Sequence, residues 1–136
     1  MQEPQDLEKI VLKVIRSGNS SILFNVEVAD SARERAIGMM FRKDVKKQSG
    51  MLFLFQDNKE RFFWMKNTFV SLDILFLDTR GVIQHIHEHA VPRSVARIPS
   101  NGSSVAVLEI GAGEAERLNI DVGDRVIYPE FFKVEE

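Results

Sequence analysis

The sequence predicts a mainly β domain, a compact antiparallel β-sandwich or jelly-roll-like barrel with two short helices. Short apolar stretches recur along the chain, they are rich in β-branched and aromatic residues, and most are joined by tight turns. Such strands pair mainly antiparallel, because a βαβ unit needs longer helical crossovers than these connections offer. The 136 residues fit one domain, so we expect a disordered tail over residues 1–8 and a single β-sandwich domain over 9–136.

The N-terminal part begins with a predicted hairpin. Residues 10–16 are apolar and β-branched, a Ser-Gly-Asn-Ser turn follows, and residues 22–28 alternate apolar and polar side chains. Asp30 or Ser31 can cap a helix over residues 32–40, because a glutamate lies in its first turn and apolar residues follow at helical spacing. After a loop, residues 51–55 are apolar without interruption, which is typical of a strand buried on both faces.

The C-terminal part continues with short strands. Further strands are predicted over residues 62–65, 72–77, 82–87, 105–110 and 125–128. Residues 56–60 are polar and predict a turn, while the prolines and the Asn-Gly pair in residues 91–103 predict an irregular surface loop. Residues 111–118 predict the second short helix.

Composition excludes several classes of function. Eighteen basic against twenty acidic residues give a net charge of −2, so we expect no nucleic-acid partner. The absence of cysteine excludes disulfides, thiolate metal sites and a cysteine nucleophile. No apolar stretch approaches the ~20 residues of a membrane span. Nucleotide-binding glycine motifs and the Gly-x-Ser-x-Gly elbow are absent, so the sequence indicates no cofactor and leans against an enzyme.

Four segments carry a resemblance to a known family: residues 36–42, 50–55, 63–68 and 72–78, in this order and spacing. With Val107-Leu108-Glu109 and Gly123-Asp124 further on, they resemble the prokaryotic family called domain of unknown function 192, over about residues 22–128. The resemblance implies a mainly β sandwich of jelly-roll type and brings no established activity. Many members are exported, so it implies a periplasmic or other extracytoplasmic location if a signal peptide has been removed, and otherwise a cytoplasmic one.

A candidate ligand site lies at the break between two predicted apolar strands. Its residues are Arg42, Trp64, Lys66, Asn67, Thr68 and Asp73. Trp64 and Lys66 share one side of a strand, which places an aromatic face beside an ammonium group. Such a set suits a small polar ligand, a sugar or an amino-acid-like molecule, or a polar chain of a partner protein. The sequence therefore favours a non-catalytic binding module.

Two alternatives stay open. In the first, the protein is a structural or protein-interaction domain, in which Asn67 and Thr68 satisfy a turn and Arg42 forms a buried ion pair with Asp73. In the second, Asp73 and Glu109 are the paired carboxylates of a hydrolase, since both fall on predicted inward faces. Buried carboxylates must be paired or carry raised pKa values, so hydrogen bonds from arginine or backbone N–H groups explain them equally.

Three alternating histidines, His85, His87 and His89, point to one side of a predicted strand. Two neighbours could bind a metal ion together with Glu109 or Asp73. The opposite side of that strand is more apolar, which favours histidines that face solvent without a metal.

Overall fold

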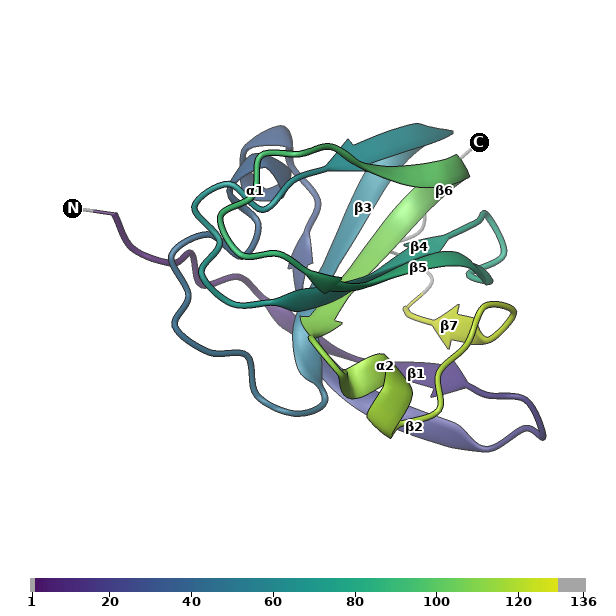
Figure 1. Ribbon diagram of the computed structural model, residues 1–136. Helices are drawn as coiled ribbons and strands as arrows, with labels where there is room; N and C mark the ends of the chain where they lie inside the picture. The colour runs from purple at the N-terminus through teal and green to yellow at the C-terminus, as the bar shows by residue number, and fades with distance from the viewer. Residues whose placement is uncertain (1, 130–136) are drawn as a thin grey trace.

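Seven strands and two short helices make up residues 2–129, the part of the chain that the computed structural model describes (Figure 1). The strands are β1 (Lys9–Ile15), β2 (Ser21–Ala29), β3 (Ser49–Phe63), β4 (Leu72–Leu77), β5 (Ile83–Ala90), β6 (Ile98–Gly111) and β7 (Arg125–Ile127), and the helices are α1 (Ala32–Ile37) and α2 (Glu114–Arg117). One curled sheet holds the strands in the order β5-β4-β6-β3-β2-β1-β7. The predicted mainly β class is confirmed.

The two outer strands of the sheet approach each other, which makes it a half-barrel. The N–H of Ile83, at the start of β5, donates a hydrogen bond of 2.8 Å to the carbonyl of Asp124, just before β7. The N–H of Val126 in β7 donates to the carbonyl of Gly81, also at 2.8 Å. Gly81 is required there because a Cβ atom would lie 2.4 Å from the Val126 oxygen.

One strand pair is parallel. β2 pairs with β3 in parallel, while β3 with β6 and β4 with both β5 and β6 are antiparallel. The prediction that the connections are too short for a parallel pair is wrong here, because residues 30–48, with α1 at their start, form the crossover. Ser31 caps α1 as predicted, by accepting a hydrogen bond of 3.2 Å from the N–H of Glu34.

β3 and β6 form a long ribbon that bends back over the outer face of the sheet. The register between them shifts between Leu54 and Lys59. Beyond that point Phe63 packs edge-on against Phe53 of the same strand and against Phe76 of β4, with ring centroids 5.2 and 5.9 Å apart. Figure 1 shows the upper arm of this ribbon lying above β4 and β5. Two separate strands were expected here, over residues 51–55 and 62–65. Because the pairing with β6 continues through the bend, both belong to the single strand β3.

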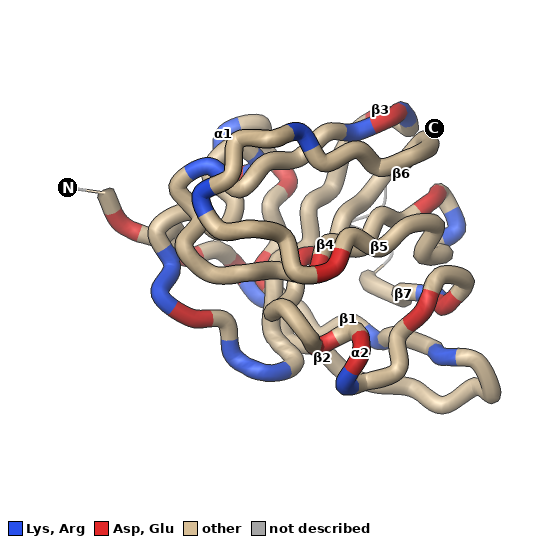
Figure 2. The backbone as a smooth tube through the Cα atoms, in the orientation of Figure 1, with Lys and Arg blue, Asp and Glu red and all other residues tan. Residues whose placement is uncertain are grey.

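The bend explains two corrections to the predicted elements. Residues 56–60, predicted as a turn, are exposed but remain within β3, where Lys59 pairs with Ser104 and Glu60 with Ser103. Figure 2 shows acidic and basic positions following one another along the backbone beside the β3 label, where the ribbon bends. Residues 98–103, predicted as loop, belong to β6, because the returning arm of β3 supplies their hydrogen-bonding partner.

Buried side chains form two cores, one on each face of the sheet. The inner core, on the concave face, includes Leu12, Phe24, Leu52, Leu75, Leu77, Leu108, Ile110 and Val126. The outer core lies beneath the returning arm and includes Met39, Met51, Phe53, Met65, Leu72, Ile74, Phe76, Ile98 and Val107. Residues 51–54 divide between the two cores, which confirms the prediction of burial on both faces.

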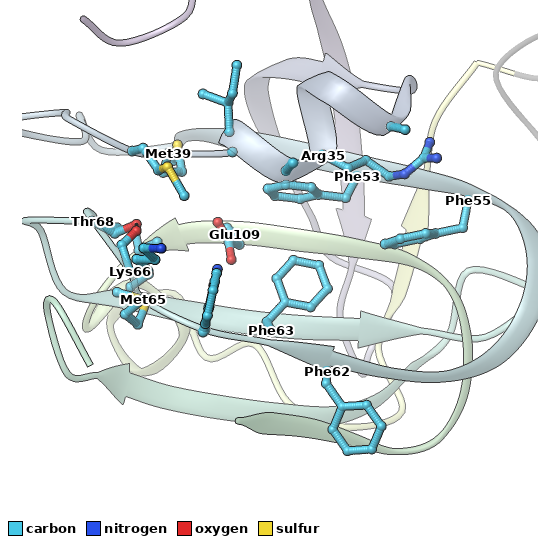
Figure 3. Close-up of a pocket in the computed structure, with 17 residues that line it drawn as sticks. Arg35, Met39, Phe53, Phe55, Phe62, Phe63, Met65, Lys66, Thr68 and Glu109 are labelled. Carbon is cyan, nitrogen blue, oxygen red and sulfur yellow. The ribbon is translucent and has the colours of Figure 1, made fainter. Parts of the chain in front are cut away.

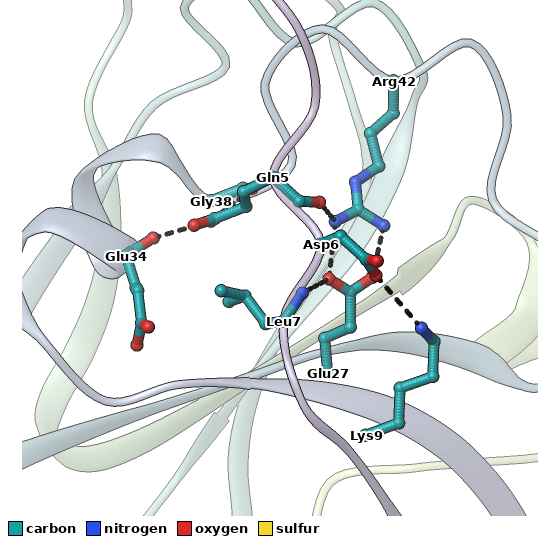
Figure 4. Close-up of polar contacts among 8 residues, drawn as sticks. All are labelled: Gln5, Asp6, Leu7, Lys9, Glu27, Glu34, Gly38 and Arg42. Carbon is teal, nitrogen blue, oxygen red and sulfur yellow. Dashed lines mark hydrogen bonds and ion pairs between the residues drawn. The ribbon is translucent and has the colours of Figure 1, made fainter.

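The predicted tail includes residues that contact the domain (Figure 4). The side chain of Gln5 donates hydrogen bonds of 3.0 Å to the carbonyls of Glu34 and Gly38. The N–H of Leu7 donates to the Glu27 carboxylate at 2.9 Å. Within residues 2–129, no helix has the length and apolar character to cross a membrane.

Candidate functional site

A pocket of about 360 Å³ lies between α1 and the bent β3–β6 ribbon (Figure 3). Its walls are mainly apolar side chains: Ile37, Met39, Met40, Phe53, Phe55, Phe62, Phe63, Trp64, Met65 and Leu72. Four polar side chains also line it: Arg35, Lys66, Thr68 and Glu109. The pocket is therefore an apolar, aromatic cavity with very few polar contacts to offer.

The bend in β3 assembles the aromatic walls. Phe53 and Phe55 lie before the bend, and Phe63 lies after it, on the returning arm. The rings of Phe55 and Phe63 also meet edge to face, with centroids 6.3 Å apart. Phe63 lies eight positions after Phe55 and ten after Phe53 on the same strand, and it touches both rings only because the ribbon folds back at the register shift.

Glu109 reaches the pocket from β6. It pairs with Met51 of β3 and Ile74 of β4 in the middle of the sheet, and the residue is only 4% exposed. Burial raises its pKa to about 8, and no hydrogen bond from residues 2–129 to its carboxylate opposes this rise. Figure 3 shows the carboxylate in the middle of the pocket, between the side chains of Met39 and Phe63.

Gly50 fixes the backbone at Glu109. A Cβ atom on Gly50 would lie 2.1 Å from the carbonyl oxygen of Glu109, so no other residue fits while β3 and β6 stay at their spacing. The glycine is one residue before Met51, the β3 partner of Glu109. The position of the Glu109 carboxyl group in the pocket therefore depends on the close approach of the β3 and β6 backbones at Gly50.

Two cations lie at the edge of the pocket. The guanidinium of Arg35 lies 5.1 Å from the centroid of Phe55 and donates a hydrogen bond of 2.8 Å to the carbonyl of Leu54. The ammonium of Lys66 lies 5.1 Å from the ring of Trp64, as predicted, although both residues follow the end of β3 and do not share a strand side. In the described part of the chain, neither cation forms an ion pair with a carboxylate.

Three of the six predicted site residues, Trp64, Lys66 and Thr68, line this pocket. The Thr68 hydroxyl donates to the Lys66 carbonyl at 3.2 Å, within the turn. Asn67 has a positive φ of 54° and accepts a backbone hydrogen bond of 2.8 Å from Phe41. Asn67 and Thr68 therefore serve the turn, as the structural alternative expects.

Arg42 lies outside the pocket, in a separate polar cluster (Figure 4). It forms a bidentate pair with Glu27 at 2.6 and 2.9 Å and donates to the carbonyl of Gln5 at 2.9 Å. The proposed Arg42–Asp73 pair is wrong, because Glu27 takes both of the guanidinium nitrogens that bind carboxylate.

Asp73 is fully buried and has a structural role. Its carboxylate accepts hydrogen bonds from the N–H groups of His89, Gly113 and Ala115, at 3.0, 3.0 and 3.1 Å. These bonds join β4 to the end of β5 and to the start of α2. Every oxygen of this carboxylate has a backbone donor, which leaves Asp73 no opening toward the pocket.

The paired-carboxylate alternative is also wrong. Asp73 pairs with Ile110, whereas Glu109 pairs with Ile74, so the two acids occupy adjacent positions across β4 and β6. Side chains alternate between faces along a strand, which sends Asp73 into the inner core and Glu109 to the outer face. Two carboxylates on opposite faces of a sheet cannot act on one bond.

The histidines do not form an evident metal centre. The ring of His85 stacks on Phe76 with centroids 5.7 Å apart, so this histidine is partly buried rather than facing solvent. Burial lowers the pKa of His85, and the neighbouring His87 lowers it further. Among residues 2–129, no three metal-ligating side chains gather at one point.

Sequence reasoning missed most of the pocket. Nothing in the sequence pattern singles out Arg35 or the pocket phenylalanines as site residues, and Glu109 is predicted only as one of a possible pair of carboxylates. One signal was available: Glu109 interrupts the apolar strand 105–110. A lone acid in a doubly buried strand marks either a paired group or a site, and here it marks the pocket.

A family model described as an uncharacterised group matches residues 13–128. This chain belongs to the domain of unknown function 192 family. Two solved structures are similar to it. One, a proposed transcription regulator from Sinorhizobium meliloti, is 36% identical with a TM-score of 0.88, over 92% of this chain and 97% of that one. The other, a protein of unknown function from Novosphingobium aromaticivorans, is 35% identical with a TM-score of 0.86, over 90% and 86%. No curated protein matches the chain.

Proposed function

We propose that this member of the domain of unknown function 192 family is a binding module for a small molecule with a protonated amine on an apolar body. The observation that carries the proposal is Glu109, a buried carboxyl group that opens into the pocket and receives no hydrogen bond from the described residues. Burying such a group without a hydrogen-bonding partner costs folding free energy, and a ligand that binds in the pocket would supply the missing partner.

The chemistry of the lining favours an amine over a sugar. A sugar presents several hydroxyl groups, and walls made of phenylalanine and methionine would leave most of them without partners. An ammonium needs one anionic partner and aromatic faces. A charge-assisted hydrogen bond contributes about 1.5 to 3 kcal/mol, and a desolvated cation over an aromatic ring about 2 kcal/mol. Of the two ligand classes that the sequence suggests, the amino-acid-like one fits better.

The direct test is a titration with pentylamine, a plain alkylammonium. Trp64 is the only tryptophan in the sequence and lines the pocket, so its fluorescence reports binding, with calorimetry as an independent measurement. At pH 9, above the Glu109 pKa of about 8, Glu109→Gln keeps the shape and removes the charge, and we expect it to weaken binding at least about tenfold, as loss of a charge-assisted bond requires. Glu88→Gln removes the same charge from an exposed position on β5 and should have no effect.

Two results would overturn the proposal. If pentylamine fails to bind the wild-type protein at any pH, the proposal of an amine ligand is refuted. Equal weakening by Glu109→Gln and Glu88→Gln would mean that net charge, rather than the carboxylate in the pocket, attracts the cation.

A further inference from the structure

We propose that the ligand is a zwitterion in which an apolar chain separates the amine at Glu109 from a carboxylate bound by Arg35. This inference rests on the proposed function, because it places one end of the ligand at Glu109. It adds the identity of the other end and the requirement that the two charges be far apart in the molecule.

Arg35 is the free cation at one end of the pocket. One of its nitrogens donates to the Leu54 carbonyl, which anchors the guanidinium over the Phe55 ring. A guanidinium has five N–H donors in a planar fork, so most of them remain available for a carboxylate. In residues 2–129 Arg35 has no ion-pair partner, although it lies in a lining that also contains an acid.

The neighbouring guanidinium of Arg61 does not offer the same charge. It lies 4.0 Å from the centroid of the Phe55 ring, so arginine groups from two elements, α1 and β3, lie near Phe55. Arg61, however, is buried and pairs with Asp57 at 2.7 Å, and its Nε donates to the Ser104 carbonyl at 2.8 Å. Of the two arginines beside Phe55, Arg35 is therefore the one that forms no ion pair within residues 2–129.

Aromatic walls separate the two ends. Figure 3 shows Phe53 and Phe63 between Glu109 in the middle of the pocket and the Arg35–Phe55 end. A ligand that contacts both ends must lay an apolar chain along these rings, where its CH₂ groups are buried. An α-amino acid carries its ammonium and carboxylate on one carbon and cannot reach both ends, so the arrangement favours an ω-amino carboxylate.

The experiment compares three probes in the wild-type protein: pentylamine, ε-aminocaproate and norleucine. ε-Aminocaproate is pentylamine with a carboxylate at its far end, and norleucine is its isomer with both charged groups on one carbon. A bidentate carboxylate on arginine should make ε-aminocaproate bind about 10 to 100 times more tightly than pentylamine. Norleucine should show no such gain.

Variants assign the gain to one residue. Arg35→Gln should abolish the advantage of ε-aminocaproate, so that ε-aminocaproate and pentylamine bind this variant with similar affinity. Lys66→Gln is the matched control, because it removes the same charge from the lining beside Trp64. It should keep the advantage. Thermal unfolding of each variant confirms that it is folded.

The outcomes separate this inference from the proposed function. If pentylamine binds but ε-aminocaproate binds no better, the proposal of a zwitterionic ligand is wrong, while the proposed amine site at Glu109 is retained. If norleucine gains as much as ε-aminocaproate, the separation of charges is wrong. A gain that Lys66→Gln removes as fully as Arg35→Gln overturns the role of Arg35. If pentylamine itself fails to bind, both proposals fall together.

Discussion

Asp73 and Glu109 lie one position apart in the register between β4 and β6, and their carboxylates leave the sheet on opposite faces. Both are buried, but only Asp73 is compensated, by three backbone N–H groups. Burial alone would assign the same role to both. The hydrogen bonds separate an acid that holds the fold together from an acid that is free to meet a ligand.

Glu109 should make stability depend on pH. Its pKa is about 8 in the folded protein against an ordinary value of 4.5, so between these limits the folded state holds a proton that the unfolded state releases. Stability is therefore lost as pH rises from about 4.5 to 8 and is constant above. Glu109→Gln should be more stable than wild type by about 3 to 5 kcal/mol near pH 9 and similar near pH 4. Urea denaturation across pH measures this, and a difference independent of pH would contradict it.

The affinity for pentylamine should rise with pH. An ammonium binds the ionised carboxylate, so the proton on Glu109 must leave first whenever the pH is below its pKa of about 8. The dissociation constant should fall by about tenfold per pH unit below pH 7 and level off above pH 8. Arg35 and Lys66 are the other charged groups of the lining, and the slope should persist when either becomes Gln. A flat profile would mean that the ligand binds the protonated acid.

Replacing Asp73 should damage the fold. Asp73→Ala leaves three N–H groups without their acceptor, and we expect a loss of about 3 to 5 kcal/mol of unfolding free energy in urea. Asp121→Ala, at an exposed position after α2, is the control and should cost less than about 1 kcal/mol. A mild effect of Asp73→Ala would show that water replaces the carboxylate.

Gly50→Ala should destabilise the protein by about 2 kcal/mol or more, because the new Cβ would lie 2.1 Å from the Glu109 carbonyl oxygen and the two strands would have to separate. Gly111→Ala on β6 is the matched control. Its Cβ would meet its nearest neighbours at 3.7 Å, an ordinary contact, so we expect little change. Thermal unfolding compares the two, and equal midpoints would refute the close contact.

Arg42 and Glu27 should stabilise the fold without affecting ligand binding. Their side chains are 17% and 7% exposed, so Arg42→Met leaves a buried carboxylate unpaired and should cost about 3 to 5 kcal/mol. Arg42→Met with Glu27→Leu should recover part of that loss. Pentylamine affinity should stay the same, because neither residue lines the aromatic pocket. Loss of pentylamine binding in a folded Arg42→Met protein would show that Arg42 contributes to the ligand site.

The sequence predicts most of this fold because local patterns determine most of its elements. The alternation in residues 22–28, the Ser31 cap and the apolar run 51–55 each identify their element. The bend in β3 could not be predicted. Polar residues at 56–60 are equally compatible with a turn and with an exposed strand that is still paired. The pocket could not be predicted either, because the contact of Phe53 with Phe63 depends on the register shift at this bend.

The bent ribbon also has a consequence for folding kinetics. The β3 residues of the pocket pair with β6 residues more than thirty positions later in the chain, and β4 and β5 are synthesised between them. The pocket cannot exist before this non-local pairing closes, and such pairings form late and slowly. A ligand that recognises only the closed ribbon should therefore slow unfolding and leave the refolding rate unchanged.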